Sequence, residues 1–151
     1  MTPPAGNGHM LAALAEAEAA AARGEVPVGA VVAAGGRILA RAGNRTRELA
    51  DPTAHAEMLA IRAACAALGS ERLPEADLYV TLEPCPMCAA AITFARIRRL
   101  YFGASDPKGG GVEHGPRIFS QPSCHHAPEI YGGIEEVRSA RLLQEFFAQR
   151  R

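Results

Sequence analysis

Four residues in two short segments could together perform metal-dependent chemistry. His55 and Glu57 are separated by one residue, and Cys85 and Cys88 by two. One imidazole and two thiolates make three zinc ligands, and a zinc ion with three protein ligands keeps a fourth position open for water. A carboxylate beside that water can move its protons. The spacing predicts a hydrolytic enzyme in which His55, Cys85 and Cys88 bind zinc and Glu57 carries protons.

The charge of this ligand set indicates which reaction to expect. Two thiolates and a neutral imidazole leave a zinc ion without net charge before water binds. Zinc lowers the pKa of its bound water far below the bulk value, so that zinc-bound hydroxide is available near neutral pH. With Glu57 passing the proton to a ring nitrogen and a leaving nitrogen, the reaction would be the hydrolytic deamination of an amidine-like carbon.

The turn signals around the two segments place both of them at helix starts. Thr53 is a good N-cap for a helix over residues 54–68, which stops at Gly69. Residues 77–82 are rich in β-branched and aromatic side chains and predict a strand. Pro86 suits the first turn of a helix reaching residue 96. Two helix N-termini can then meet at one edge of a sheet, where open α/β folds place their ligands.

The rest of the chain alternates in the same way. The pattern predicts an α/β sheet with helices on its faces. Residues 105–131 are rich in Gly, Pro, Ser and His and read as one long loop, a length that is often functional. Further helices are expected over residues 9–23 and 139–149, with strands over 28–34, 37–42, 98–104 and 134–137.

Composition limits the class of protein. The 151 residues suit one domain over residues 1–151, and the formal net charge is zero, so any binding of a polyanion must be local. A Cys-x-x-Cys pair with a distant histidine favours a metal site in a reducing compartment over a disulfide framework. We find neither a secretory signal nor an apolar run long enough to span a bilayer. A cytoplasmic protein is expected.

The sequence also resembles a known family over nearly its whole length. His-x-Glu with Pro-Cys-x-x-Cys is the signature of zinc-dependent nucleobase deaminases. The chain resembles the cytidine-deaminase-like superfamily, and within it the bacterial tRNA adenosine deaminases. The segments that carry the resemblance are residues 25–30, 43–45, 51–58 and 79–88, extended by Arg96, Ile97, Phe102–Ala104, Asp106 and Lys108.

The resemblance implies a fold, a substrate and further site residues. The fold would be a three-layer αβα sandwich around a central five-stranded mixed sheet, the assembly a homodimer with one Zn²⁺ per subunit, and the substrate the wobble adenosine of a tRNA anticodon stem-loop. Asn44 would hydrogen-bond the flipped nucleoside. The remaining contacts implied are Val28 and Ala30 in the base pocket, the Pro84–Cys85 backbone at the attacking water, and Asp106 and Lys108 at the anticodon loop.

Two alternatives remain open from the sequence. Deaminases of free bases or nucleosides share this zinc core, and the neutral charge and short C-terminal tail suit them. A zinc-stabilised binding module without catalysis would need a fourth protein ligand. The spare candidates for that ligand lie in the long loop, at Cys124, His125 and His126.

Overall fold

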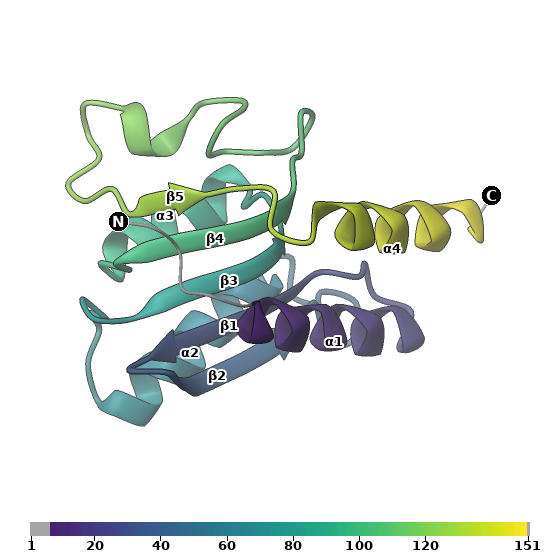
Figure 1. Cartoon of the computed structure of the whole chain (residues 1–151), viewed down its shortest axis with the longest axis horizontal. Helices are drawn as coiled ribbons and strands as arrows, with labels where there is room; N and C mark the ends of the chain where they lie inside the picture. The colour runs from purple at the N-terminus through teal and green to yellow at the C-terminus, as the bar shows by residue number, and fades with distance from the viewer. Residues whose placement is uncertain (1–6, 151) are drawn as a thin grey trace.

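A computed structural model describes residues 7–150, in which helices and strands alternate along the chain (Figure 1). The elements in order are α1 (Gly8–Ala22), β1 (Gly29–Ala34), β2 (Arg37–Gly43), α2 (Ala56–Leu68), β3 (Asp77–Leu82), α3 (Pro86–Phe94), β4 (Arg99–Ala104), the short 3-10 helix η1 (Ile118–Ser120), β5 (Glu129–Tyr131) and α4 (Glu136–Ala148).

The five strands form one mixed sheet in the order β2-β1-β3-β4-β5. Strand β1 runs antiparallel to both β2 and β3, whereas β3, β4 and β5 are parallel to one another. Because Ala30 pairs with Val80, the start of β1 lies beside the end of β3. The chain entering β1 and the segments leaving β3 and β4 therefore meet at one edge of the sheet.

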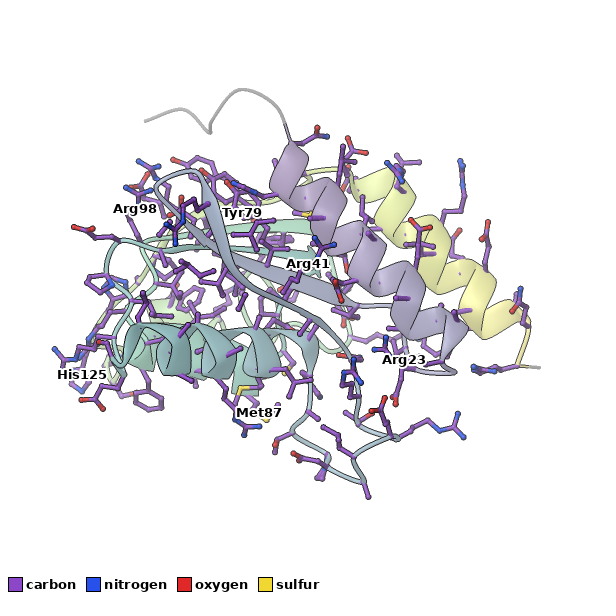
Figure 2. The ribbon with its side chains drawn as sticks, turned by 90° about the horizontal axis from the view of Figure 1, so that it is seen from below. Arg23, Arg41, Tyr79, Met87, Arg98 and His125 are labelled. Carbon is purple, nitrogen blue, oxygen red and sulfur yellow. The ribbon has the colours of Figure 1, made fainter. Side chains whose placement is uncertain are left out.

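Helices cover both faces of this sheet. Helices α2 and α3 lie on one face and α1 and α4 on the other (Figures 1 and 2). The predicted three-layer αβα sandwich with a five-stranded mixed sheet is confirmed. The central strands β1, β3 and β4 are almost wholly buried because both of their faces are covered. None of the helices within residues 7–150 is long and apolar enough to cross a membrane.

Helix α1 lies unusually close to β1, and a glycine makes this possible. A Cβ atom added to Gly29 would lie 1.9 Å from the carbonyl oxygen of Ala13 and 2.6 Å from the backbone nitrogen of Ala17. Any side chain would push the helix away from the sheet. The absence of a side chain at Gly29 therefore allows α1 to pack closely against β1.

The last strand lies five residues before its predicted place. Residues 129–131 form β5 and pair in parallel with β4, so the prediction of a strand over 134–137 was wrong. Gly133 adopts a φ of +81°, and α4 begins at Glu136, which leaves no room for a strand there. The segment Glu129-Ile130-Tyr131 could not be recognised within the long polar loop because a strand of three residues is too short to show a periodic pattern.

Helix α2 also begins later than predicted. Its N-cap is His55, with an extended backbone, and the first helical residue is Ala56. The Thr53 hydroxyl instead donates to the Asp51 carboxylate at 2.8 Å, within the turn that precedes the helix. The N-cap prediction for Thr53 was therefore wrong, and the N-cap position belongs to the candidate zinc ligand.

Candidate metal centre and its cavity

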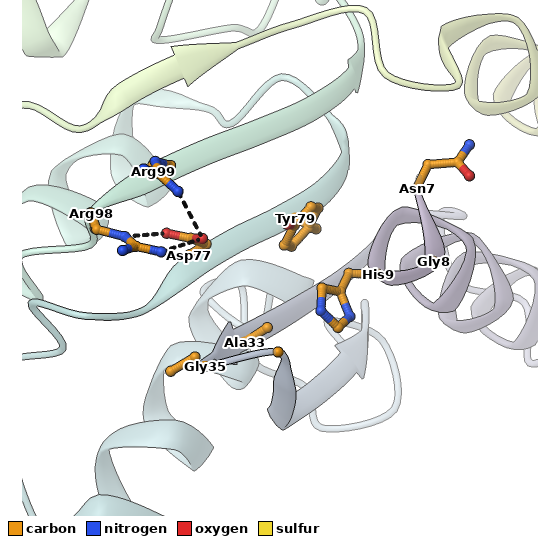
Figure 3. Close-up of a pocket in the computed structure, with 11 residues that line it drawn as sticks. Asn7, Gly8, His9, Ala33, Gly35, Asp77, Tyr79, Arg98 and Arg99 are labelled. Atoms are coloured by element: carbon orange, nitrogen blue, oxygen red, sulfur yellow. Dashed lines mark hydrogen bonds and ion pairs between the residues drawn. The ribbon is translucent and has the colours of Figure 1, made fainter. Parts of the chain in front are cut away.

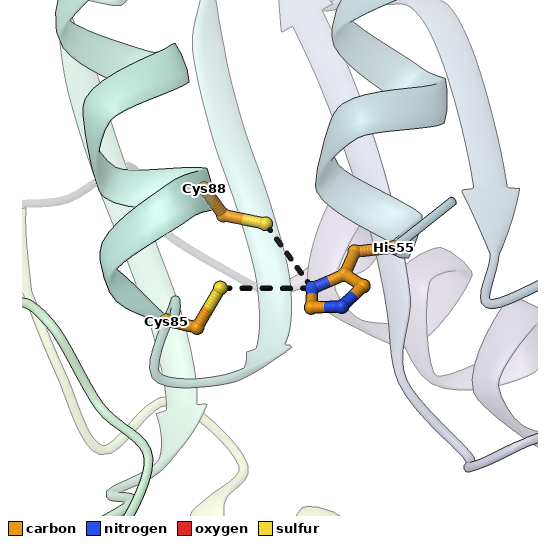
Figure 4. A group of neighbouring side chains, drawn as sticks. All are labelled: His55, Cys85 and Cys88. Atoms are coloured by element: carbon orange, nitrogen blue, oxygen red, sulfur yellow. Dashed lines mark hydrogen bonds between the residues drawn. The ribbon is translucent and has the colours of Figure 1, made fainter. Parts of the chain in front are cut away.

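The three predicted zinc ligands come together where α2 and α3 begin (Figure 4). His55 and Cys85 occupy the N-cap positions of α2 and α3, and Cys88 lies in the first turn of α3. Pro86 at the start of α3 has a backbone suited to the first turn and needs no hydrogen bond there. Each ligand is thus fixed by the turn that starts a helix.

The spacing of the ligand atoms fits one tetrahedral ion. Nδ1 of His55 lies 3.6 Å from Sγ of Cys85 and 3.5 Å from Sγ of Cys88. Zinc bonds of usual length at tetrahedral angles would separate nitrogen and sulfur by about 3.6 Å. An imidazole with two thiolates is also a donor set that zinc prefers. The cluster could therefore hold a zinc ion with little rearrangement.

Within the described residues, the cluster has three potential metal ligands and no fourth. The sulfur of Cys124 contacts the Thr93 hydroxyl at 3.1 Å. Nε2 of His126 is 2.6 Å from the carbonyl oxygen of Ile97. These side chains are engaged at the far end of α3. A three-ligand site leaves one position for a reacting water, as catalytic zinc sites do.

The two thiols have different proton affinities. A hydrogen bond from Cys88 is the main cause that lowers the pKa of Cys85 to about 4, and the nearby His55 imidazole acts in the same direction against the effect of burial. The same hydrogen bond, together with burial, raises the pKa of Cys88. A bound metal ion would deprotonate both sulfurs.

Glu57 lies beside the ligands and is almost inaccessible to solvent, with 4% of its surface exposed. Burial raises its pKa to about 7, and the neighbouring Cys85 thiolate adds to the effect. A carboxyl group with a pKa near the working pH can both accept and release a proton, which is what a general acid-base residue needs.

A cavity of about 320 Å³ opens onto these residues. Six of the ten site residues expected from the sequence line it. Five further lining residues, whose part in the site the sequence did not reveal, are Val26, Thr46, Leu82, Glu83 and Gly109. The exposed Lys108 does not line it, nor do the buried Ala30 and Pro84. The six expected residues that line it are Val28, Asn44, His55, Glu57, Cys85 and Asp106, and the tenth, Cys88, is buried and does not line it.

Asn44 has a structural contact that the sequence did not suggest. Its Oδ1 accepts a hydrogen bond of 2.8 Å from the backbone N–H of Ala56, the first residue of α2. Its Nδ2 has no acceptor within residues 7–150. The amide is therefore oriented by the helix, with its oxygen on the backbone and its two N–H donors left for a ligand in the cavity.

A second cavity, of about 350 Å³, lies at the opposite edge of the sheet (Figure 3). Its polar side chains are largely paired with one another. Arg98 makes two contacts of 3.0 Å with Asp77, and Arg99 lies 4.0 Å from the same carboxylate. Within residues 7–150, no cluster of metal-binding side chains lies in this cavity. The chemistry suggested by the sequence belongs to the first cavity.

A His/Cys/Cys cluster with His-x-Glu and Pro-Cys-x-x-Cys spacing is the signature of the zinc-dependent nucleobase deaminases. Residues 7–151 match the MafB19-like deaminase family. The tRNA-specific adenosine deaminase of Agrobacterium fabrum is 67% identical over 139 residues, which cover 92% of this chain and 91% of that protein. The chain therefore belongs to the MafB19-like deaminase family and is a member of the tRNA-specific adenosine deaminases.

Solved structures support the same assignment. A structure from a study of A-to-I editing by tRNA:A34 deaminases matches with a TM-score of 0.89 at 67% identity, covering 90% of this chain and 99% of that one. The guanine deaminase of Bacillus subtilis matches with a TM-score of 0.66 at 31% identity, covering 95% of this chain and 92% of that one. The free-base deaminase shares the fold but is more distant in sequence and in structure.

Proposed function

We propose that this protein is a zinc-dependent hydrolase that converts the wobble adenosine of a tRNA anticodon loop to inosine. The observation that carries the proposal is the 67% identity to a tRNA-specific adenosine deaminase across 92% of the chain. The geometry adds a three-ligand cluster with a buried carboxyl group beside it. The overall reaction consumes adenosine and water and yields inosine and ammonia.

The metal-binding part of the proposal assigns His55, Cys85 and Cys88 to one Zn²⁺ in each subunit. The distances between their ligand atoms suit a tetrahedral ion, as described above. When bound, zinc lowers the pKa of water in its open position and so supplies a nucleophile near neutral pH. The protein supplies the cavity and the fixed directions of the three ligands.

Glu57 is proposed to carry the protons. Its carboxylate takes a proton from the attacking water and delivers it to the ring nitrogen next to the carbon under attack. It then assists proton transfer to the amino group, which leaves as ammonia while the carbonyl of inosine forms. The pKa of about 7 given by its burial suits both directions of transfer near neutral pH.

The substrate contacts follow from the lining of the cavity. Nδ2 of Asn44 donates to the nucleoside, and Val28 forms an apolar wall with Ala30 buried behind it. We assign the Pro84–Cys85 backbone to the attacking water. Asp106 at the rim and the exposed Lys108 are assigned to the anticodon loop.

To reach this cavity, the target adenosine of the RNA must flip out of the base stack. The target carbon of a stacked base is out of reach, so the nucleotide has to rotate into the pocket. A single-stranded loop allows this at lower cost than a duplex, because its bases are already partly unstacked. An anticodon loop is such a substrate.

We further propose that residues 1–151 form one deaminase domain that acts as a homodimer in the cytoplasm. The family match over residues 7–151 supports a single domain. The location follows from that of its tRNA substrate. The 71% exposed side chain of Phe94, at the end of α3, is the surface feature that suits a subunit contact.

A substrate panel tests the function. Zinc-loaded protein is incubated with an anticodon stem-loop bearing adenosine at the wobble position, and separately with free guanine, cytosine, adenine and their nucleosides. Inosine formation in the stem-loop, far faster than ammonia release from any free base, is expected. Rapid deamination of a free base with an unchanged stem-loop would instead favour the alternative, a free-base or nucleoside deaminase.

A further inference from the structure

Glu83 has a buried side chain that is surrounded by hydrogen-bond donors. It follows β3 directly, and its side chain is 0% exposed. Oε1 accepts from the backbone N–H of Asp106 at 3.0 Å. Oε2 accepts from the backbone N–H groups of Val112, Glu113 and His114 at 3.2, 2.9 and 3.1 Å. One carboxylate therefore holds both ends of the segment 106–114.

The His114 ring adds a fifth contact, with its Nδ1 2.8 Å from Oε1 of Glu83. The carboxylate is thus an acceptor for every donor around it. An amide in its place would turn two N–H donors toward other donors.

The segment 106–114 fits tightly around this carboxylate. A Cβ atom added to Gly110 would lie 2.3 Å from Oε2 of Glu83 and 2.5 Å from the carbonyl oxygen of Asp106. The backbone N–H of Gly111 donates to the Pro84 carbonyl at 2.8 Å, next to the candidate ligand Cys85. The segment is therefore attached at several points to the strand end that carries the metal site.

The same segment forms a wall of the cavity. Asp106 and Gly109 line it, and so does Glu83 itself. The Asp106 carboxylate is in turn occupied locally, because its Oδ1 accepts from the backbone N–H of Gly109 at 2.9 Å. The position of this wall depends on the bonds from Glu83 to the backbone, since the segment contains no helix or strand.

We infer that Glu83 is a positioning residue that holds the segment 106–114 against the cavity and so sets the affinity for the RNA substrate. This inference rests on the proposed function. Glu83 acts through the backbone of the segment and takes no part in the proton transfers assigned to Glu57. Its loss should raise KM for the stem-loop and leave kcat and the metal content nearly unchanged.

The test compares Glu83→Gln with Glu113→Gln in zinc-loaded protein. Both variants lose one negative charge, but the Glu113 side chain is exposed and its backbone N–H is retained. For the anticodon stem-loop, Glu83→Gln should raise KM about tenfold, a free-energy difference of about 1.4 kcal/mol. Glu113→Gln should leave KM equal to or below that of the wild type, because a lost negative charge favours RNA.

Hydrogen exchange gives an independent readout. The amides of Asp106 and Val112–His114 should exchange faster in Glu83→Gln than in the wild type, whereas the amides of β3 should not. If Glu83→Gln fails to fold, His114→Ala decides, since it removes only one of the five contacts. His114→Ala should raise KM several-fold at unchanged kcat.

The inference is overturned if folded Glu83→Gln has a wild-type KM, or if it loses zinc and kcat together, which would assign Glu83 to the metal site. A wild-type KM in His114→Ala overturns it equally when Glu83→Gln cannot be obtained. If the proposed function itself is wrong, the result is different: the wild type and Glu113→Gln also leave the stem-loop adenosine intact.

Discussion

Asn44 is assigned two roles, one in capping α2 and one in binding the nucleoside, and two substitutions can separate them. Its Oδ1 accepts the backbone N–H of Ala56, and its Nδ2 is assigned to the nucleoside. Asn44→Ala removes both groups. Asn44→Asp keeps an acceptor for the helix but removes the N–H donors. The two variants should therefore differ in stability and share a loss of activity.

The stability difference can be estimated from the buried hydrogen bond. In Asn44→Ala the N–H of Ala56 is left without its partner, which costs about 2 kcal/mol. For a chain of this size, that lowers Tm by about 4–8 °C. In Asn44→Asp the bond is retained, and a carboxylate at the start of α2 also interacts favourably with the helix dipole. Its Tm should stay within about 2 °C of the wild type.

Both variants should deaminate the stem-loop at least about tenfold more slowly in kcat/KM, the equivalent of one lost hydrogen bond. Thermal unfolding of zinc-loaded protein and initial rates of inosine formation measure the two effects. Equal losses of Tm in the two variants would refute the helix-capping role. Full activity in Asn44→Asp would refute the assignment of Nδ2 to the substrate.

Three further predictions concern the fold and the metal. Gly29→Ala should lower the free energy of unfolding in urea by about 1–3 kcal/mol, because the methyl group would overlap α1, whereas Gly8→Ala meets nothing within 4 Å and should be neutral. Burial opposes ionisation of Glu25, but hydrogen bonds from two backbone N–H groups outweigh it and lower the pKa of this carboxyl group below the usual 4.5. The ionised carboxylate therefore stabilises the folded protein fully above pH 4.5, and this contribution is lost as the pH falls. The stability deficit of Glu25→Gln should accordingly shrink from pH 7 to pH 4 in urea titrations, and a constant deficit would contradict this. Removing zinc with a chelator should lower Tm and abolish turnover, and Cys88→Ser should bind less zinc by elemental analysis.

The grouping of the zinc-ligand candidates could be predicted from the sequence because local signals determine it. Pro86 and the Cys-x-x-Cys spacing place two sulfurs on one helix start, and His55 precedes a second helix. The order of strands then brings both starts to the same edge. The structure confirms this meeting, while the roles of the individual residues stay predictions.

Other parts of the site depend on contacts between distant segments, which no local pattern reveals. Glu83 bonds to residues 23 to 31 positions later in the sequence, and Asn44 to a residue 12 positions later. The strand at 129–131 is specified by its pairing with β4 more than by its own three residues. Sequence periodicity cannot show such contacts, because they form only when the chain is folded.

The measurement closest to the central claim follows one RNA through one turnover. Zinc-loaded wild-type protein and Glu57→Gln are mixed with an anticodon stem-loop bearing a wobble adenosine, in water labelled with heavy oxygen. Mass spectrometry then reads the nucleosides. The wild type should yield inosine carrying the heavy oxygen together with ammonia, and Glu57→Gln should retain zinc but yield almost none. An unchanged adenosine with folded, zinc-loaded wild type, or equal rates in both proteins, would contradict the account.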